Sequence, residues 1–477
     1  MHFKQRLLSI LLVVIMLSGT IIGSNGIITW KTEETQEAET VWTSRKETIY
    51  IWYVDAALEN YINRAAVVFG EQEGVRVIPV LKDTMVLLED VNAATMDSEK
   101  QTPDAYVINN DELGKAYLAG LATEIQNQSG LVNEAWYPKT ALSAVTCNGK
   151  LVAYPFYFDT CVLIYNKDYV DLWLKQQSER VPDTIEIEGG EDGGTVEVTA
   201  SDLAEEGLAA ELIAEDSVGE DGIPKTVGGI LQFANDFDAP EGVDGVMKWD
   251  VADIFYNYWV VGAYLNVGGE SGDDEDNVNV YNDETVECLQ VYQALNQFFY
   301  IEPESVDYEA AMQDFMEGKM VFTIGTTESV QQLEEAKQNG SFPFEYGIAN
   351  IPDITKELQS RPLSVTEAVA VNGYSAHKDL ANRFAEYLTH TYAPELYAKA
   401  GKISTSFAAN RGTELQSVFI EQYEDSISLP KMMEIGNLWL QLEALFAKVW
   451  NGEDVLPLVR RLEEQISTQI GSEKQTE

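Results

Sequence analysis

Carboxylates and amides next to apolar runs are the residues of this chain best placed to do chemistry. Asp159 lies alone between two strand-like apolar runs, at residues 151–158 and 162–165. An unpaired carboxylate is costly to bury, so we expect Asp159 to face a water-filled cleft. Asn109 and Asp111 stand at the carboxyl end of another such run, where open α/β sheets bind ligands. Both groups can hydrogen-bond the hydroxyls of a polar solute.

Catalytic motifs are scarce in the sequence. The three histidines, His2, His377 and His390, form no zinc pattern, and there is no Walker A, G-x-S-x-G or G-x-G-x-x-G after a strand. The acidic run at residues 273–277 lacks the glycine and glutamate spacing of a calcium loop. We therefore predict a binding protein rather than an enzyme, with no metal and no cofactor. A glycosidase-like carboxylate pair stays open as an alternative.

The charge balance narrows the choice of partners. The 477 residues carry 31 Lys and Arg against 79 Asp and Glu, a net charge of −48. A chain with this negative charge is unsuited to bind nucleic acid or an anionic lipid surface. The three cysteines, Cys147, Cys161 and Cys288, fit no zinc or redox pattern. We expect buried free thiols, with a Cys147–Cys161 bridge as the alternative.

The N-terminus reads as a targeting segment. Lys4 and Arg6 precede an uncharged run of 24 residues, 7–30. As a helix this run could cross ~30 Å of hydrocarbon, with its basic end inside the cell. We expect an uncleaved membrane anchor, with a cleaved signal peptide as the alternative, and an exported body. Residues 31–47 are polar and predict a flexible linker.

The body begins with a strand–helix–strand pattern. Residues 48–54 are apolar and β-prone, helical spacing follows from Leu58 to Phe69, and residues 75–81 form a second strand. This βαβ unit predicts a parallel sheet and an α/β class. A third strand is expected over residues 102–109. An Asn148-Gly149 turn predicts a hairpin before the run that holds Asp159.

Later segments add further elements. Residues 183–222 are rich in Gly, Asp and Glu and contain a possible hairpin of residues 184–188 and 195–199. We interpret this stretch as a surface insertion. A helix over 307–317, closed by Gly318, should lead into a strand over 319–324. Amphipathic helices are expected at 377–392 and 435–450.

Three segments together resemble a known family. The runs are N-G-K-L-V-A-Y-P with L-I-Y-N-K-D at residues 148–168, A-A-M-Q-D-F-M-E-G-K-M at 310–320, and S-V-T-E-A-V-A-V-N at 364–372. They resemble the type 1 extracellular solute-binding proteins of ABC importers, the maltose-binding-protein-like family, over residues 48–470. The resemblance implies a two-lobed periplasmic-binding-protein type II fold. Each lobe would be a mixed, mainly parallel sheet flanked by helices, with a ligand cleft between the lobes.

The resemblance also implies a domain division. Residues 48–158 plus 369–412 would form lobe 1, and residues 159–368 plus 413–470 would form lobe 2 and carry the 183–222 insertion. Residues 471–477 would be a tail. Runs 148–158 and 364–372 would hold the two crossings between the lobes.

The family's ligand contacts map onto nine positions. They are Asn109, Asp111, Asp159, Asp250, Phe255, Tyr256, Thr327, Glu328 and Trp439. Three of them fall within residues 249–258, which resemble an aromatic-rich helix that lines the second lobe in this family. Aromatic faces cover the apolar patches of a sugar, and carboxylates or amides bind its hydroxyls. Structural alternatives stay open. The aspartates could cap helices or bond at a hinge, and the aromatic rings, Trp439 included, could belong to the core.

Departures from the family pattern bear on the ligand. Where relatives often read N-G-P-W, this chain reads Gly325-Thr326-Thr327-Glu328, and residues 55–57 lack the Asp-Lys pair of the maltose binder. A saccharide other than maltodextrin is therefore expected, and the carboxylates would also suit a cationic solute such as a polyamine.

The resemblance implies a function for the whole chain. We expect an extracellular, monomeric, substrate-binding component of an ABC transporter from a Gram-positive cell, which delivers a carbohydrate to a membrane permease. A surface-anchored sensor or scaffold and, further off, a carbohydrate-processing enzyme are alternatives. Many such proteins are lipoproteins with Cys after a similar L-S-G, but Thr20 stands there, so we predict no lipid anchor.

Overall fold

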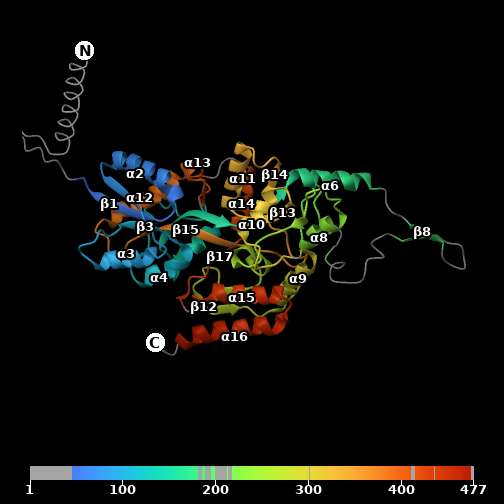
Figure 1. Cartoon of the computed structure of the whole chain (residues 1–477). Helices are drawn as coiled ribbons and strands as arrows, with labels where there is room; N and C mark the ends of the chain where they lie inside the picture. Colours follow the sequence, from blue (N-terminus) through green and yellow to red (C-terminus); the bar gives the residue numbers. More distant parts are fainter. Residues whose placement is uncertain are drawn as a thin grey trace, which may run out of the picture. The chain divides into compact units, whose positions relative to one another are not determined.

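The computed structural model describes most of the chain after residue 45. The described residues are 46–180, 185–188, 195–198, 212, 217–299, 301–409, 414–433 and 436–473. The expected anchor at residues 1–30, and the linker as far as residue 45, lie outside them. Two main β-sheets with helices packed around them make up the described part (Figure 1).

The expected βαβ unit opens the fold. Strand β1 (Thr48–Tyr53) leads into α2 (Glu59–Glu73), and β2 (Arg76–Leu81) then pairs in parallel with β1. The C-cap of α2 is Gly74, whose φ of 69° lies in the left-handed region that glycine tolerates. Strand β3 (Ala105–Asn109) pairs in parallel with the other side of β1. The predicted parallel arrangement is confirmed for these strands.

The first main sheet has seven strands. Their order is β16-β6-β15-β3-β1-β2, with β17 added beside β15. The further strands are β6 (Ala153–Thr160), β15 (Leu363–Val371), β16 (Ile403–Ser404) and β17 (Ile427–Ser428). The sheet is mixed, because β15 runs antiparallel to both β3 and β6.

Helices cover both faces of the seven-stranded sheet (Figure 1). One face packs on α2, α12 (Lys378–Glu386) and α13 (Leu396–Ala400). The other face packs on α3 (Leu87–Met96) and α4 (Leu113–Leu118). The layering is therefore α/β/α. The helix expected at 377–392 ends as α12 at Glu386 and continues as a π-helical segment, Tyr387–Thr391.

The second main sheet has four strands in the order β10-β13-β7-β14. These strands are β7 (Val162–Asn166), β10 (Gly245–Met247), β13 (Met320–Gly325) and β14 (Tyr346–Ala349). The helices that pack on it are α6 (Lys167–Glu179), α8 (Val227–Asp236), α9 (Asp283–Phe299), α10 (Tyr308–Met316) and α11 (Thr327–Asn339). Helices α15 (Leu438–Trp450) and α16 (Val455–Glu473) pack on α9 and on each other. The predicted helix–Gly–strand unit is present as α10, Gly318 and β13.

Strands β6 and β15 form an antiparallel pair that we call the crossing ribbon, residues 153–160 and 363–371. Only Cys161 separates β6 in the first sheet from β7 in the second. The expected lobe boundaries, after residues 158 and 368, fall inside these two strands. A register shift beside Glu367 marks a bulge in the ribbon. Bulges of this kind re-aim side chains next to functional sites.

Smaller elements complete the description. Asn148 and Gly149, with φ of 49° and 71°, form the turn between β4 (Thr146–Cys147) and β5 (Lys150–Leu151). The insertion contains the expected hairpin, β8 (Ile185–Glu188) with β9 (Thr195–Val198). The remaining elements are α5 (Lys139–Ala144), β11 (Asn266–Gly268), β12 (Asp274–Asn279) and α14 (Glu414–Glu424).

The aromatic segment around Trp249 differs from expectation. A helix was predicted by analogy over residues 249–258, but the chain forms only two short 3₁₀ turns, Ile254–Tyr256 and Tyr258–Val260. The reason is local, because Asp250 and Asp253 accept hydrogen bonds from nearby backbone N–H groups. Such bonds compete with helix formation.

No helix among the described residues has the length and apolar character to cross a membrane.

Candidate functional site

A cavity of about 410 Å³ lies between residues attached to the two sheets. Small-molecule sites span roughly 300–1,000 Å³, so this volume can hold a ligand. The crossing ribbon contributes Tyr157, Asp159, Val365 and Glu367. The other lining residues are Val54, Asp55, Val107 and Lys402 near the seven-stranded sheet, and Asp253, Phe255, Tyr256, Thr326 and Glu328 near the four-stranded sheet.

Asp159 joins the two sides of this cavity. Its Oδ1 accepts hydrogen bonds from the Thr327 backbone N–H at 3.1 Å and from the Thr327 hydroxyl at 3.0 Å. Burial raises the pKa of Asp159 above its ordinary value, and the Thr327 hydrogen bonds and the Lys402 charge oppose this rise. The hinge hydrogen bond considered for Asp159 is therefore present. A carboxylate has several acceptor positions, so the same group can still accept from a ligand hydroxyl.

The start of α11 holds this contact in place. Thr326 is the N-cap residue, and its backbone N–H donates to the Ser329 hydroxyl at 2.7 Å in a capping box. Thr327 is the first residue of the helix, so the positive end of the helix dipole faces Asp159. Glu328 is exposed beside it and lines the cavity.

Lys402 is the cation on the seven-stranded side. Its Nζ lies 3.0 Å from Asp55 Oδ2 and 5.5 Å from the centre of the Tyr157 ring. The Tyr157 hydroxyl also donates to Asp55, at 3.4 Å. Asp55 itself caps the turn after β1 by accepting from the Ala57 N–H. The end of β1 therefore presents a carboxylate that is held by a lysine and a tyrosine.

Glu367 lines the cavity together with Asp55 and Asp159. Burial, with the charges of Asp111 and Asp55, raises its pKa to about 8, although Lys402 acts in the opposite direction. Asn109 lies opposite Glu367 in the β3–β15 register. Its hydrogen-bonding surroundings assign the amide orientation in which the nitrogen donates to both Glu367 carboxylate oxygens.

Asp111 does not line the cavity. Its Oδ1 atom is buried and has no hydrogen-bond partner among the described residues. Burial raises its pKa. Asp111 is part of a 3₁₀ turn, Asn110–Glu112, whose N-cap is Asn109. It therefore acts on the cavity through its charge on Glu367.

An aromatic cluster forms the opposite wall. Tyr256 stacks on Tyr308 with ring centres 5.3 Å apart and planes at 17°, and Phe255 meets Tyr256 edge-on at 5.6 Å. Asp253 caps this turn by accepting from the Phe255 N–H at 2.8 Å. Phe255 and Tyr256 are only partly buried and line the cavity, so their rings can contact a ligand.

Two other predicted residues lie elsewhere. Asp250 is buried, and its carboxylate accepts from the backbone N–H groups of Ala252, Asp253 and Tyr308. The capping role considered for it is therefore the observed one. Trp439 packs against the core around Tyr258, with ring centres 6.2 Å apart, and does not line the cavity.

The structure adds site residues that the sequence analysis did not select. Glu367 is a lone carboxylate in an apolar strand, which is the same signal that drew attention to Asp159. Asp55 and Asp253 both follow β-prone or aromatic segments in a chain full of acidic residues, and Lys402 has no local signal at all. Only the fold brings Lys402 to Asp55.

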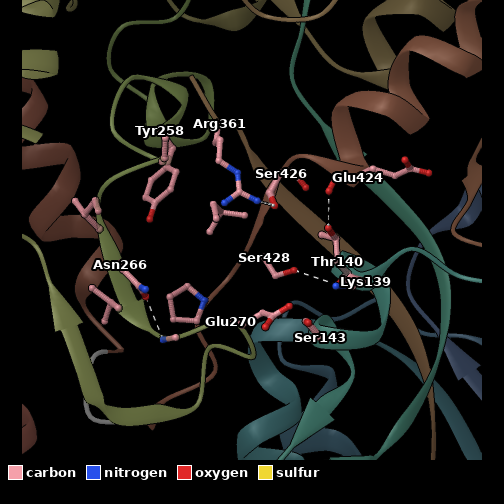
Figure 2. A pocket seen from close by; sticks show the side chains of 17 residues that line it. Lys139, Thr140, Ser143, Tyr258, Asn266, Glu270, Arg361, Glu424, Ser426 and Ser428 are labelled. Carbon is pink, nitrogen blue, oxygen red and sulfur yellow. Dashed lines mark hydrogen bonds between the residues drawn. The ribbon is translucent and has the colours of Figure 1, made fainter. Parts of the chain in front are cut away.

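A second cavity, of about 380 Å³, lies on the opposite face of the crossing ribbon. Figure 2 shows Tyr258, Asn266, Ser428 and Arg361 around it. Arg361 donates to the Asp425 and Ser426 carbonyls, which fixes the segment before β17. The Tyr258 hydroxyl opens into this cavity without a hydrogen-bond partner in the described part of the chain.

The described residues offer little support for other chemistry. No group of three or more His, Cys, Asp or Glu residues suited to a metal ion occurs among the residues described. The three cysteines are buried free thiols, as expected, and the alternative Cys147–Cys161 bridge is absent.

Comparison with known families decides the identity of the fold. Residues 65–422, three quarters of the chain, match the model of the bacterial extracellular solute-binding proteins. The chain belongs to this family. The prediction of a solute-binding protein rather than an enzyme is thereby confirmed, and so is its place outside the cell.

Individual members of the solute-binding family agree with this placement. The maltodextrin-binding protein MdxE of Bacillus subtilis is 22% identical over 411 residues, which cover 84% of each chain. A maltooligosaccharide ABC transporter solute-binding lipoprotein of Streptococcus pneumoniae is 23% identical over 407 residues, covering 81% of this chain and 80% of that protein.

Solved structures support the two-lobed α/β fold. The maltose-binding protein of Listeria monocytogenes, in complex with maltose, superposes with a TM-score of 0.67 at 21% identity, covering 90% of this chain and 99% of that one. An extracellular solute-binding protein of Staphylococcus aureus, also with maltose, gives 0.68 at 17% identity over the same shares. The predicted fold class is confirmed.

Proposed function

We propose that the protein captures a mono- or oligosaccharide in the cavity at Asp159 and delivers it to an ABC permease. The observation that carries the proposal is that residues attached to both sheets line the cavity, and that the ribbon between the sheets lines it as well. The family match and the names of the maltodextrin- and maltooligosaccharide-binding relatives support this reading.

The cavity has the two kinds of partner that a sugar requires. The Phe255 and Tyr256 rings offer apolar faces for C–H groups. Asp159, Glu367 and Glu328 offer acceptors for hydroxyls. Thr327 stays in contact with Asp159 and does not line the cavity, so we assign it to positioning that carboxylate.

Closure follows from the position of the ribbon. We divide the body as the sequence suggests, with lobe 1 at residues 48–158 plus 369–412 and lobe 2 at residues 159–368 plus 413–470. A ligand that contacts both walls binds the closed arrangement more tightly and shifts the population toward it. Exclusion of water then strengthens each polar contact. The closed form would dock as a monomer on the permease.

Attachment to the cell is proposed through the N-terminal segment. The run at residues 7–30 would remain as a membrane anchor, since Thr20 offers no thiol for a lipid. The Streptococcus pneumoniae relative is named a lipoprotein, so the two would differ in how they are anchored. Mass spectrometry of the protein extracted from membranes distinguishes an intact N-terminus from a cleaved or lipidated one.

A ligand screen tests the proposal. Thermal shift across mono- and oligosaccharides should give a rise in Tm, because a ligand at 100 times its Kd adds about 2.7 kcal/mol of stability. Asp159→Ala should remove that rise, whereas Glu335→Gln, an exposed change two turns along α11, should keep it. An unaltered shift in Asp159→Ala takes this residue out of the site, and a screen with no saccharide hit defeats the function.

A further inference from the structure

The walls of the ligand cavity are strongly unbalanced in charge. In the part of the chain that the structure describes, five carboxylates line it and Lys402 is the one cation. The carboxylates are Asp55, Asp159, Asp253, Glu328 and Glu367. A neutral saccharide supplies hydroxyls to these groups but does not change their total charge.

The positive charge of Lys402 compensates carboxylates on one wall of the cavity, the wall formed by the crossing ribbon and the end of β1. Lys402 forms its ion pair with Asp55 at 3.0 Å, and its charge also acts on Asp159 and Glu367. All three carboxylates belong to the crossing ribbon or to the end of β1. On this wall the protein already supplies an ammonium group, and that group lies near the Tyr157 ring.

Among the described residues, the opposite wall has no such cation. Neither Asp253 nor Glu328 forms an ion pair in the described part of the chain, and both are exposed. They flank the Tyr256–Tyr308 stack. The charge of Asp253 acts on the Tyr256 hydroxyl, that of Glu328 acts on the Tyr308 hydroxyl, and that of Asp159 acts on both. Carboxylates beside an aromatic face form a site for an ammonium ion.

Resting on the function proposed above, we infer that the preferred saccharide carries a protonated amine, held between Asp253 and Glu328 beside the Tyr256 ring. The arrangement on this wall parallels the one that Lys402 makes with Asp55 and Tyr157 on the other. The sugar ring then lies against Phe255, and its hydroxyls reach Asp159.

Closure gives the amine a second role. When the lobes approach, Asp253 and Glu328 move toward Asp55 and Asp159, and like charges in a drying cleft repel. A ligand ammonium between the walls turns this repulsion into attraction. A neutral sugar leaves the repulsion in place, so the closed form is favoured less.

Calorimetry with matched sugars tests the inference on the whole exported body. The probes are glucosamine oligomers of two to four units, the same oligomers fully N-acetylated, and maltooligosaccharides, all at pH 6.5 and low salt. The glucosamine oligomer should bind at least tenfold more tightly than its acetylated partner. Exposed ion pairs are screened by salt, so 0.5 M NaCl should shrink this ratio.

Two variants locate the amine. Asp253→Asn keeps the acceptor that caps the Phe255 N–H while removing its charge. Glu328→Gln removes the charge in the first turn of α11. Their combination should reduce the preference for the amino sugar over its acetylated partner to about threefold or less. Glu335→Gln, on the same helix, should keep the full preference. Circular dichroism confirms folding in each case.

The outcomes separate the two proposals. Equal or tighter binding of an uncharged saccharide overturns the amine inference and leaves the carbohydrate function standing. A preference that persists in the double variant overturns the assigned position. Spermidine binding without any saccharide binding defeats the carbohydrate function itself.

Discussion

The crossing ribbon has two faces that carry different kinds of side chain. The front face lines the ligand cavity, and the rear face packs into the core. On one face Tyr157, Asp159, Val365 and Glu367 line the ligand cavity. On the other face Phe158 stacks on Tyr423 with ring centres 3.9 Å apart. Successive side chains of a strand alternate between its faces, so neighbouring residues serve the cavity and the core.

Several polar side chains on the rear face find their hydrogen-bond partners within the protein. Thr366 bonds to the Tyr423 hydroxyl at 2.7 Å, and Ser426 donates to Ser364 at 2.7 Å. Near this face the Lys431 ammonium donates to the Ser143 and Ala144 carbonyls at the end of α5. The front face instead crowds carboxylates whose charges oppose one another. The rear face is therefore built for stability, and the front face gains its missing partners from a ligand.

The sharpest test of this division is to remove adjacent residues of β6. Phe158→Ala should lower the free energy of unfolding by about 3–5 kcal/mol, because a fully buried ring is lost from the core. Asp159→Ala should change stability far less and remove ligand binding. Urea denaturation and calorimetry of both variants measure the two effects. If Phe158→Ala left stability intact while Asp159→Ala unfolded the protein, the roles would be reversed.

The next largest effect concerns the charge of Glu367. Its raised pKa, about 8, means that the folded protein holds a proton that the unfolded chain releases near pH 4.5. Stability attributable to this group therefore falls as the pH rises from about 4.5 to 8. Glu367→Gln should remove that fall and be ~1–3 kcal/mol more stable than the parent at pH 8, with little difference at pH 4.5. Denaturation curves of both proteins across this range give the comparison.

Much of the fold follows from local pattern, and the exceptions have physical causes. The opening βαβ unit has clear periodicity and a glycine C-cap, so strands β1 and β2 and helix α2 start and end within a few residues of expectation. The helix predicted over residues 249–258 is absent because the aspartates of this segment and Asn257 hydrogen-bond to the backbone or to buried groups. In a helix these side chains would face outward.

The site shows the same contrast. Asp159 can be found because a lone carboxylate in an apolar run requires a reason, and Glu367 carries that signal too. The role of Lys402 cannot be predicted from its sequence neighbours. Lys402 and Asp55 are far apart in the sequence, and only the fold brings them into contact. Trp439 lies on an apolar helical stripe, and there the core interpretation agrees with the packing seen.

Titration of Lys431 gives a smaller effect of the opposite sign at the rear. Burial lowers the pKa of Lys431 to about 8, while the nearby Cys147 and Asp273 act to raise it. Between pH 8 and about 10.5 the unfolded chain binds more protons, so the contribution of this group to stability rises with pH. The difference in the free energy of unfolding between the parent and Lys431→Met should change by ~1–2 kcal/mol across that range. If this difference did not change with pH, the Lys431 ammonium would be solvated in the folded protein.

The smallest expected effect is at Tyr258, where the rear face has its own cavity (Figure 2). The ring is buried, and its hydroxyl makes no hydrogen bond with the described residues. Tyr258→Phe removes only that hydroxyl and should change the free energy of unfolding by less than about 0.5 kcal/mol. Ligand affinity, measured by calorimetry, should stay within about twofold, because the crossing ribbon separates this cavity from the cleft. A tenfold change in affinity would show that the two cavities are coupled through the ribbon, and the division between a structural rear and a binding front would no longer hold.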